Sequence, residues 1–113
     1  MKEVIFEHQS EPYLFQIGEN KHENFAIIDD SSKTDIWFHV ENEPSCHVVY
    51  KNINNHKLHD IPRQVIRHGV YLCKIHSKAK TKKTTIMYTP MKNVEKTAII
   101  GQVMVSIYWT IEM

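Results

Sequence analysis

The chain has 113 residues, of which 42% are hydrophobic and 24% are charged, values typical of one globular domain. It holds no apolar run near the roughly 20 residues that cross a bilayer. Acidic residues stand near the N-terminus, where an export signal has its apolar stretch. The cysteines, Cys46 and Cys73, form no CxxC pair or dense framework, which fits buried thiols or a single disulfide. We therefore expect a cytoplasmic protein with no membrane partner.

The net charge of +1 hides an uneven distribution of charge along the chain. Residues 1–45 hold ten acidic and three basic residues, whereas residues 46–113 hold eleven basic and three acidic residues. One interpretation is a dipolar molecule whose basic side meets phosphate groups. The other is that the two halves interleave in space and cancel locally.

The first predicted element is an N-terminal β-hairpin. Residues 4–6 and 13–17 form its strands, and residues 10–12 supply turn-forming side chains. Residues 23–28 then predict a short helix or a turn, and residues 29–33 a polar loop.

Two further strands follow, because residues 36–41 and 47–51 are rich in β-branched and aromatic side chains. Residues 42–45, which include Pro44, form a tight connection between them.

The main helix is predicted over about residues 61–77. Asp60 suits the N-cap and Pro62 the first helical turn. Side chains of the buried face recur at helical spacing; they are Ile61, Val65, His68, Leu72 and Ile75.

The last elements are two strands. Residues 84–89 form one, ended by Pro90, and residues 103–112 alternate apolar and other side chains with a strict period of two. Strands on both sides of one long helix predict a single α+β domain over residues 1–113, with the main helix packed on a mostly antiparallel sheet.

The densest functional signal is the segment 74–83, which has five lysines and no acidic residue. Lysines near a helix C-terminus are favourable on dipole grounds alone. The functional interpretation is that they contact phosphates without reading sequence. Arg63 and Arg67 lie four residues apart and extend the patch along the helix. The candidate phosphate contacts are Lys74, Lys78, Lys80, Lys82, Lys83, Arg63 and Arg67.

The second signal lies in the strand at 36–41, where Trp37 and His39 point to one face. With Tyr50 nearby in the sequence, these rings could stack on unpaired bases. The alternative is that Trp37 fills the core and His39 makes a local hydrogen bond.

Metal binding and catalysis have little support in the sequence. His39, Cys46 and His47 are suitable zinc ligands, but neighbours on a strand point to opposite faces and no fourth ligand has a recognisable spacing. The motifs GxSxG, GxxxxGK[ST], GxGxxG and HExxH are absent. We therefore expect no metal, no cofactor and no enzymatic activity.

Two neighbouring segments carry a resemblance to a known family. Residues 35–40 read D-I-W-F-H-V and residues 44–49 read P-S-C-H-V-V, which together resemble the core of the NFACT-R domain. Weaker matching elements occur in order from about residue 13 to residue 105; they are I-G-E-N at 17–20, S-K at 77–78, M-Y-T-P at 87–90, V-E-K at 94–96 and G-Q-V at 101–103.

The resemblance implies an RNA-binding module. Large members of this family associate with the large ribosomal subunit and tRNA during ribosome quality control, and short members add a coiled-coil tail. Residues 59–65 and 88–90 are more similar to the short members, and because the sequence ends at Met113 we expect a stand-alone domain without that tail.

The expected ligand is therefore tRNA or rRNA. Its phosphates would meet the basic residues named above, while Trp37, His39 and His47 shape or line the surface. Two alternatives remain open: docking on a ribosomal or translation protein through the acidic first half, and binding of DNA through the same basic residues.

Overall fold

The computed structural model describes residues 1–78 and 82–113. Its strands and helices, in chain order, are β1 (Lys2–His8), β2 (Glu11–Gly18), α1 (Lys21–Asp29), β3 (Ile36–Val40), β4 (His47–Tyr50), the 3₁₀ turn η1 (Leu58–Asp60), α2 (Arg63–Ile75), β5 (Thr85–Pro90), the 3₁₀ turn η2 (Met91–Asn93), β6 (Val94–Lys96), β7 (Val103–Val105) and β8 (Trp109–Glu112). Neither α-helix in this part of the chain has the length and apolar character that crossing a membrane requires.

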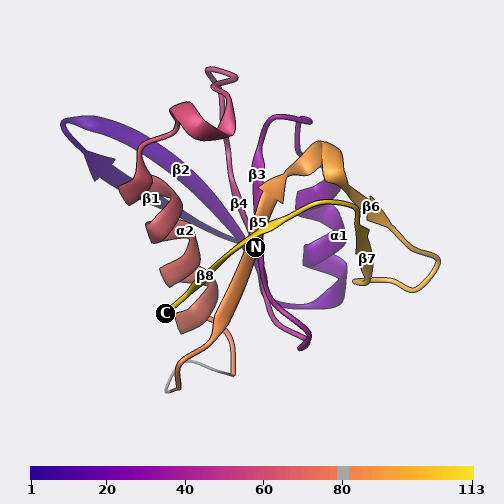
Figure 1. Cartoon of the computed structure of the whole chain (residues 1–113). Coiled ribbons are helices and arrows are strands. Elements are labelled where there is room, and N and C mark those ends of the chain that lie inside the picture. Colours follow the sequence, from indigo (N-terminus) through magenta and orange to yellow (C-terminus); the bar gives the residue numbers. More distant parts are fainter. Residues whose placement is uncertain (79–81) are drawn as a thin grey trace.

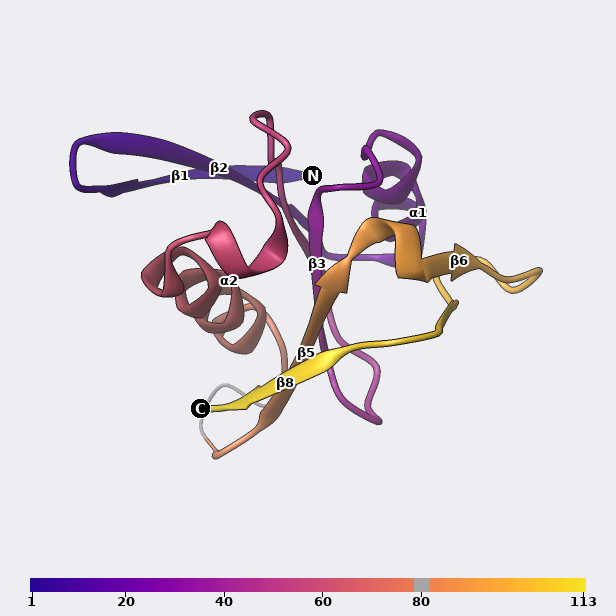
Figure 2. The same ribbon diagram turned by 45° about the horizontal axis from the view of Figure 1, so that its top comes forward.

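The strands form a six-stranded sheet in the order β1-β2-β4-β3-β5-β8, and β6 and β7 form a separate two-stranded sheet. Every neighbouring pair is antiparallel. The β1–β2 hairpin turns at Gln9 and Ser10, whose positive φ angles of 51° and 65° are those of a tight hairpin turn, and it extends beyond the rest of the sheet (Figure 2).

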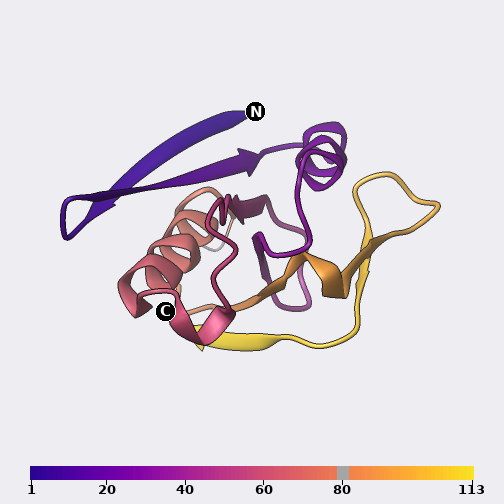
Figure 3. The same cartoon turned by 90° about the horizontal axis from the view of Figure 1, so that it is seen from above.

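The two faces of the large sheet are covered by different elements. Helix α2 covers one face, and α1 together with the β6–β7 hairpin covers the other (Figures 1 and 3). Alternation along β3 divides its side chains accordingly: Phe38 and Val40 join the core under α2, and Trp37 joins the core under α1. The predicted α+β class and the packing of the main helix on an antiparallel sheet are confirmed.

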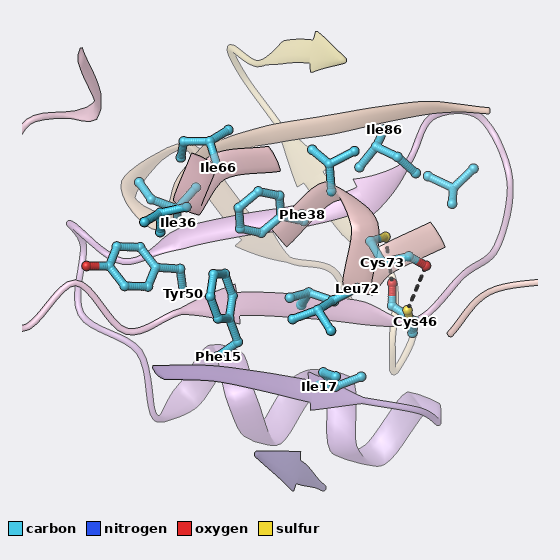
Figure 4. Packing of buried hydrophobic residues seen from close by; sticks show 14 of the residues in the cluster. Phe15, Ile17, Ile36, Phe38, Cys46, Tyr50, Ile66, Leu72, Cys73 and Ile86 are labelled. Atoms are coloured by element: carbon cyan, nitrogen blue, oxygen red, sulfur yellow. Dashed lines mark hydrogen bonds between the residues drawn. The ribbon is translucent and has the colours of Figure 1, made fainter. Parts of the chain in front are cut away.

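The core under α2 is dense around Phe38 (Figure 4). Phe15, Phe38 and Val48 are fully buried in it. Helix α2 contributes one apolar stripe, including Val65 and Val70, and brings Gly69 directly over the Phe38 ring. A side chain larger than hydrogen at residue 69 has no room there.

The main helix is shorter than the predicted span of 61–77. It runs from Arg63 to Ile75, with Pro62 at the N-cap and His76 at the C-cap. Asp60 does not cap it, because residues 58–60 form the separate turn η1. Composition favours a cap at Asp60, but the chain changes direction between Asp60 and Pro62 before α2 begins.

The predicted strand at 103–112 is in fact two strands in two different sheets. β7 pairs with β6, and β8 pairs with β5 at the edge of the large sheet. Between them the backbone is held elsewhere: Ser106 N–H donates to the Asn93 carbonyl, and the Ile107 carbonyl accepts from the Thr89 hydroxyl. A period of two shows that side chains alternate between the two faces of a strand, but it does not show which strand each part of the segment pairs with.

Candidate nucleic-acid interface

Trp37, His39 and His47 come together on the sheet face that is turned toward α1. The His39 ring lies parallel to the Trp37 ring, with centroids 5.4 Å apart and an angle of 9° between the planes. The His47 ring meets the His39 ring edge-on at 4.8 Å. Trp37 Nε1–H donates to His47 Nδ1 at 3.1 Å. The sequence placed Trp37 and His39 on one face, and the structure adds His47 from the neighbouring strand β4.

Trp37 is 1% exposed and therefore has no free face on which a base could stack. Trp37 therefore fills the core, which was the alternative interpretation of the sequence. His39 is half-buried and lies over Trp37, so the exposed edge of this aromatic group is a histidine ring.

Burial keeps both histidines uncharged near neutral pH. It lowers the pKa of His47 to about 3, with a smaller contribution from the neighbouring His39. Burial also lowers the pKa of His39, although its hydrogen bond with the Val40 carbonyl at 2.6 Å acts in the opposite direction. The group therefore offers polar but uncharged edges.

A cavity of about 560 Å³ lies against these rings. The sheet supplies its floor, and the start of α1, the β3–β4 loop and the β6–β7 hairpin supply its walls. Gly101 lines one side of the cavity, and the nearby Lys21 leaves no room there for a Cβ atom. The cavity has both apolar walls, such as Met87 and Val105, and polar ones, such as Asn42 and Gln102.

Asp35, at the start of the D-I-W-F-H-V segment, has a structural role. It is 3% exposed, and its carboxylate accepts from Ser32, from Asn52 N–H at 2.9 Å and from Lys51 Nζ at 3.0 Å. This buried and fully partnered carboxylate joins the start of β3 to the chain that follows β4, and it is turned away from solvent.

The predicted lysine run surrounds the end of α2 and the start of β5, and most of its described members have partners. Lys74 Nζ donates to the Met113 carbonyl at 2.6 Å. Lys82 pairs with Glu43 at 3.6 Å and Lys83 with Glu112 at 3.3 Å, both on the surface. Lys78 is exposed. Lys80 lies outside the described residues.

The two predicted arginines do not extend this run. Arg63 and Arg67 are exposed on the N-terminal half of α2, whereas the lysines gather beyond its C-terminal end. Arg63 lies near Tyr88: burial raises the pKa of that phenol, and the guanidinium acts in the opposite direction.

The structure reveals a basic groove that sequence reasoning missed. Its volume is about 360 Å³, and three exposed lysines, Lys33, Lys57 and Lys92, line it together with His56, His59 and Trp109. No Asp or Glu is among its described lining residues. The Trp109 side chain is 41% exposed. We name this feature the β5–η2 groove. Its lysines are far apart in the sequence, so no local run of charge could have indicated it.

The uneven charge of the two halves of the chain is partly neutralised by ion pairs that join them. Asp29 pairs with Lys96, Asp35 with Lys51 and Glu43 with Lys82, each joining an acid of the first 45 residues to a lysine of the remainder. Interleaving of the two halves is therefore the better description, and the β5–η2 groove is a basic surface with no Asp or Glu among its described lining residues.

The structure separates the three residues weighed as zinc ligands. Cys46 lies in the core under α2, where its thiol donates to the Cys73 carbonyl at 3.4 Å (Figure 4). His39 and His47 lie on the opposite face of the sheet. Over residues 1–78 and 82–113, no three His, Cys, Asp or Glu side chains are grouped to hold a metal ion, and the two cysteines are free thiols.

Residues 2–107 match the family model for the NFACT protein RNA binding domain. Among curated proteins, the chain is 35% identical over 98 residues to coiled-coil domain-containing protein 25 of Bos taurus, covering 83% of this chain and 47% of that protein. It is 37% identical over 92 residues to Protein JLP2 of Saccharomyces cerevisiae, covering 77% of this chain and 44% of that one. The chain thus spans less than half the length of these relatives.

A solved structure has the same fold. The C-terminal part of the fibronectin/fibrinogen-binding protein from Streptococcus suis aligns with a TM-score of 0.82 at 20% identity, over 99% of this chain and 45% of that one. At this identity the likeness concerns the fold alone.

Proposed function

This chain belongs to the family of NFACT protein RNA-binding domains, and from that premise we propose that it binds structured RNA, namely tRNA or rRNA, in the cytoplasm without catalysing a reaction. The family model is that of an RNA-binding domain, which supports RNA binding in general. The observation that carries the tRNA or rRNA proposal is the β5–η2 groove. No Asp or Glu is among its described lining residues, and its three lysines stand beside a half-exposed tryptophan.

Lysine ammonium groups attract phosphates without reading sequence, and an exposed indole ring can stack on a base. The groove combines both groups within one surface. Arg63 lies near Tyr88, against which Trp109 packs with ring centroids 6.5 Å apart, and adds a further cation near that surface.

The β5–β8 edge connects the groove to the lysine run. Trp109 pairs with Tyr88 near one end of this strand pair, and Glu112, the partner of Lys83, pairs with Thr85 at the other. The three residue steps between these two pairs span roughly 10 Å, a distance short enough for one RNA backbone to contact both ends. We propose that Lys78, Lys82 and Lys83, and Lys74 beneath them, form a second and weaker phosphate contact, since most of them already have acidic or carbonyl partners.

The test compares charge reversal at the two ends of this edge. Fluorescence anisotropy of labelled tRNA, titrated with salt, is measured for wild type, for the Lys33→Glu/Lys92→Glu variant and for the Lys82→Glu/Lys83→Glu variant. We expect the groove variant to bind most weakly and to show the flatter salt dependence, because each lost phosphate contact lowers the slope by about 0.7–0.9. Wild-type affinity in both variants would show that RNA does not contact this edge.

Duplex DNA of equal length is the second arm of that test, because lysine–phosphate contacts alone do not distinguish the two polymers. Tighter binding of tRNA than of DNA supports the RNA proposal, and equal binding favours a general phosphate-binding surface.

A ribosomal or translation protein is the second candidate partner. The observation in its favour is the outer surface of the β6–β7 hairpin, where Ile99 is 59% exposed and Met104 is 68% exposed. Substitution of both by serine would reduce capture of such a partner and leave tRNA binding by the purified domain unchanged.

A further inference from the structure

The cavity beside His39 and His47 is separate from the surface proposed above. None of the lysines of the β5–η2 groove lines it, and it lies on the other side of β3 from Phe38 and α2. Its polar edges are defined by two histidine rings whose outer nitrogens have no hydrogen-bond partner among the described residues.

His47 presents a hydrogen-bond donor to this cavity. Its Nδ1 accepts from the Trp37 indole N–H at 3.1 Å, so in the neutral ring the proton resides on Nε2. The ring is 1% exposed and lines the cavity. Since Nε2 has no hydrogen-bond partner among the described residues, a ligand acceptor that enters the cavity can take this N–H.

His39 presents a hydrogen-bond acceptor. Its Nδ1 lies 2.6 Å from the Val40 carbonyl. Because a carbonyl only accepts, Nδ1 carries the proton and Nε2 of the neutral ring has a free lone pair. The two rings lie 4.8 Å apart between centroids and both line the cavity, so its lining includes one acceptor and one donor on neighbouring side chains.

The remainder of the cavity has the size and the mixed apolar and polar lining of a small-ligand pocket. Its volume of about 560 Å³ falls within the range of roughly 300–1,000 Å³ for small-ligand pockets. Met87, Val103 and Val105 supply apolar walls, and the exposed Lys21 stands at the rim as a cation for a phosphate. The His39 ring, which lies parallel to the buried Trp37 ring, adds an aromatic side chain to the lining.

We propose that this cavity binds one unpaired nucleobase, with the acceptor at His39 Nε2 and the donor at His47 Nε2 meeting the paired donor and acceptor of its Watson–Crick edge. Every base carries such a neighbouring pair: an amino group beside a ring nitrogen, or a carbonyl beside a ring N–H. A base extruded from RNA is recognised in this manner, through its edge and its flat faces. The proposal rests on the proposed function and adds to it a site for a single nucleotide.

The first experiment uses wild-type protein labelled with ¹⁵N-histidine and observes the imidazole nitrogens by NMR. We expect His39 as the Nδ1–H tautomer and His47 as the Nε2–H tautomer. Each of the four nucleoside 5′-monophosphates is then titrated, with ribose 5-phosphate as the control. At least one nucleotide should shift both Nε2 resonances, whereas ribose 5-phosphate should shift neither.

The second experiment measures tRNA affinity for two cavity variants and one control. His39→Phe keeps a ring over Trp37 and removes the acceptor, and Val103→Phe fills the cavity from its wall. His22→Phe adds the same ring at an exposed residue of α1 that does not line the cavity. We expect each cavity variant to bind tRNA about tenfold more weakly and the control to bind like wild type.

The outcomes distinguish this proposal from the RNA-binding function itself. If tRNA binds but no nucleotide shifts the histidine nitrogens and Val103→Phe retains full affinity, the base cavity is wrong while the RNA-binding function stands. If nucleotides shift both nitrogens but tRNA does not bind, the cavity is a free-nucleotide site and the RNA-binding function is wrong. Because the titration uses wild-type protein, it decides the question even if a variant fails to fold.

Discussion

At the scale of single residues, two histidines on neighbouring strands carry their protons on different nitrogens. Trp37 fixes the proton of His47 on Nε2, and the Val40 carbonyl fixes that of His39 on Nδ1. Burial makes the neutral form the stable one for both, because charge is costly away from water.

Acid should therefore destabilise the fold through His47. Its pKa is lowered in the folded protein from 6.5 to about 3, so below pH 6.5 the unfolded chain binds the proton more readily than the folded one. The stabilising contribution is complete above pH 6.5 and is lost as the pH falls toward 3, with a slope approaching about 1.4 kcal/mol per pH unit.

Urea unfolding at pH 7, 6, 5 and 4 measures this loss. A His47→Gln variant is the control, since its side chain does not titrate, and its stability should fall less steeply between pH 6.5 and 4. Parallel slopes for wild type and variant would show that another group governs the acid sensitivity.

Gly69 should not tolerate even one added methyl group. A Cβ atom there would lie 2.2 Å from Phe38 Cζ, and Phe38 is fully buried. Alanine favours a helix by up to about 1 kcal/mol over glycine, but overpacking a dense core costs about 1–3 kcal/mol, so the clash should dominate.

We expect Gly69→Ala to lower the free energy of unfolding, and Gln64→Ala, at an exposed residue of the same helix, to leave it nearly unchanged. Urea denaturation of both variants checks this. A Gly69→Ala variant as stable as wild type would mean that the Phe38 ring can move aside.

At the scale of elements, the ends of β3 and β4 are held by a buried acid and not by their strand pairing alone. The Asp35 carboxylate joins Ser32, Asn52 and Lys51, and its backbone carbonyl accepts from Met91 N–H at 2.7 Å. Trp37 thus lies two residues after Asp35, which contacts the segments that follow both neighbouring strands, β4 and β5.

Asp35→Ala should destabilise the protein by about 3–5 kcal/mol, because it leaves the largely buried Lys51 and several N–H donors without their buried partner. Asp30→Ala is the matched control. It removes the other acid paired with Lys51, but the Asp30 side chain is 67% exposed, so the loss should be within about 1 kcal/mol. Chemical denaturation of both variants measures the difference, and equal losses would contradict the anchoring role of Asp35.

At the scale of the whole molecule, the two cysteines report on global opening. Cys73 on the buried face of α2 and Cys46 beneath that helix donate to each other's carbonyl groups. We expect their reaction with a thiol reagent to be slow in the native protein and to follow the rate or extent of global unfolding as urea is added. Rapid labelling of the native protein would show that α2 opens locally.

The packing of the whole molecule also determines which lysines are free to bind phosphates. Most described lysines of the 74–83 segment have acidic or carbonyl partners for their side chains, whereas Lys33, Lys57 and Lys92 line one groove that has no Asp or Glu among its described lining residues. A run of charge in the sequence is therefore a poor guide to the electrostatic surface of this fold, and this is why we place the stronger RNA contact in the β5–η2 groove.

Local sequence determined much about this protein. Alternation in residues 36–40 placed Trp37 and His39 on one face and Phe38 on the other, and helical periodicity found α2 to within two residues at each end. The motif around Asp35 and His47 identified the family. These features depend on side-chain period and order along the chain, which a sequence shows directly.

Tertiary structure alone decided the rest. It split residues 103–112 between two sheets, buried Trp37, brought His47 against His39 and assembled the β5–η2 groove from residues 33, 57 and 92. Each of these depends on which segments pair across long distances in the chain. That pairing determines which strands are neighbours, which side chains are buried and which charges are neutralised. The periodicity of the sequence does not show any of these.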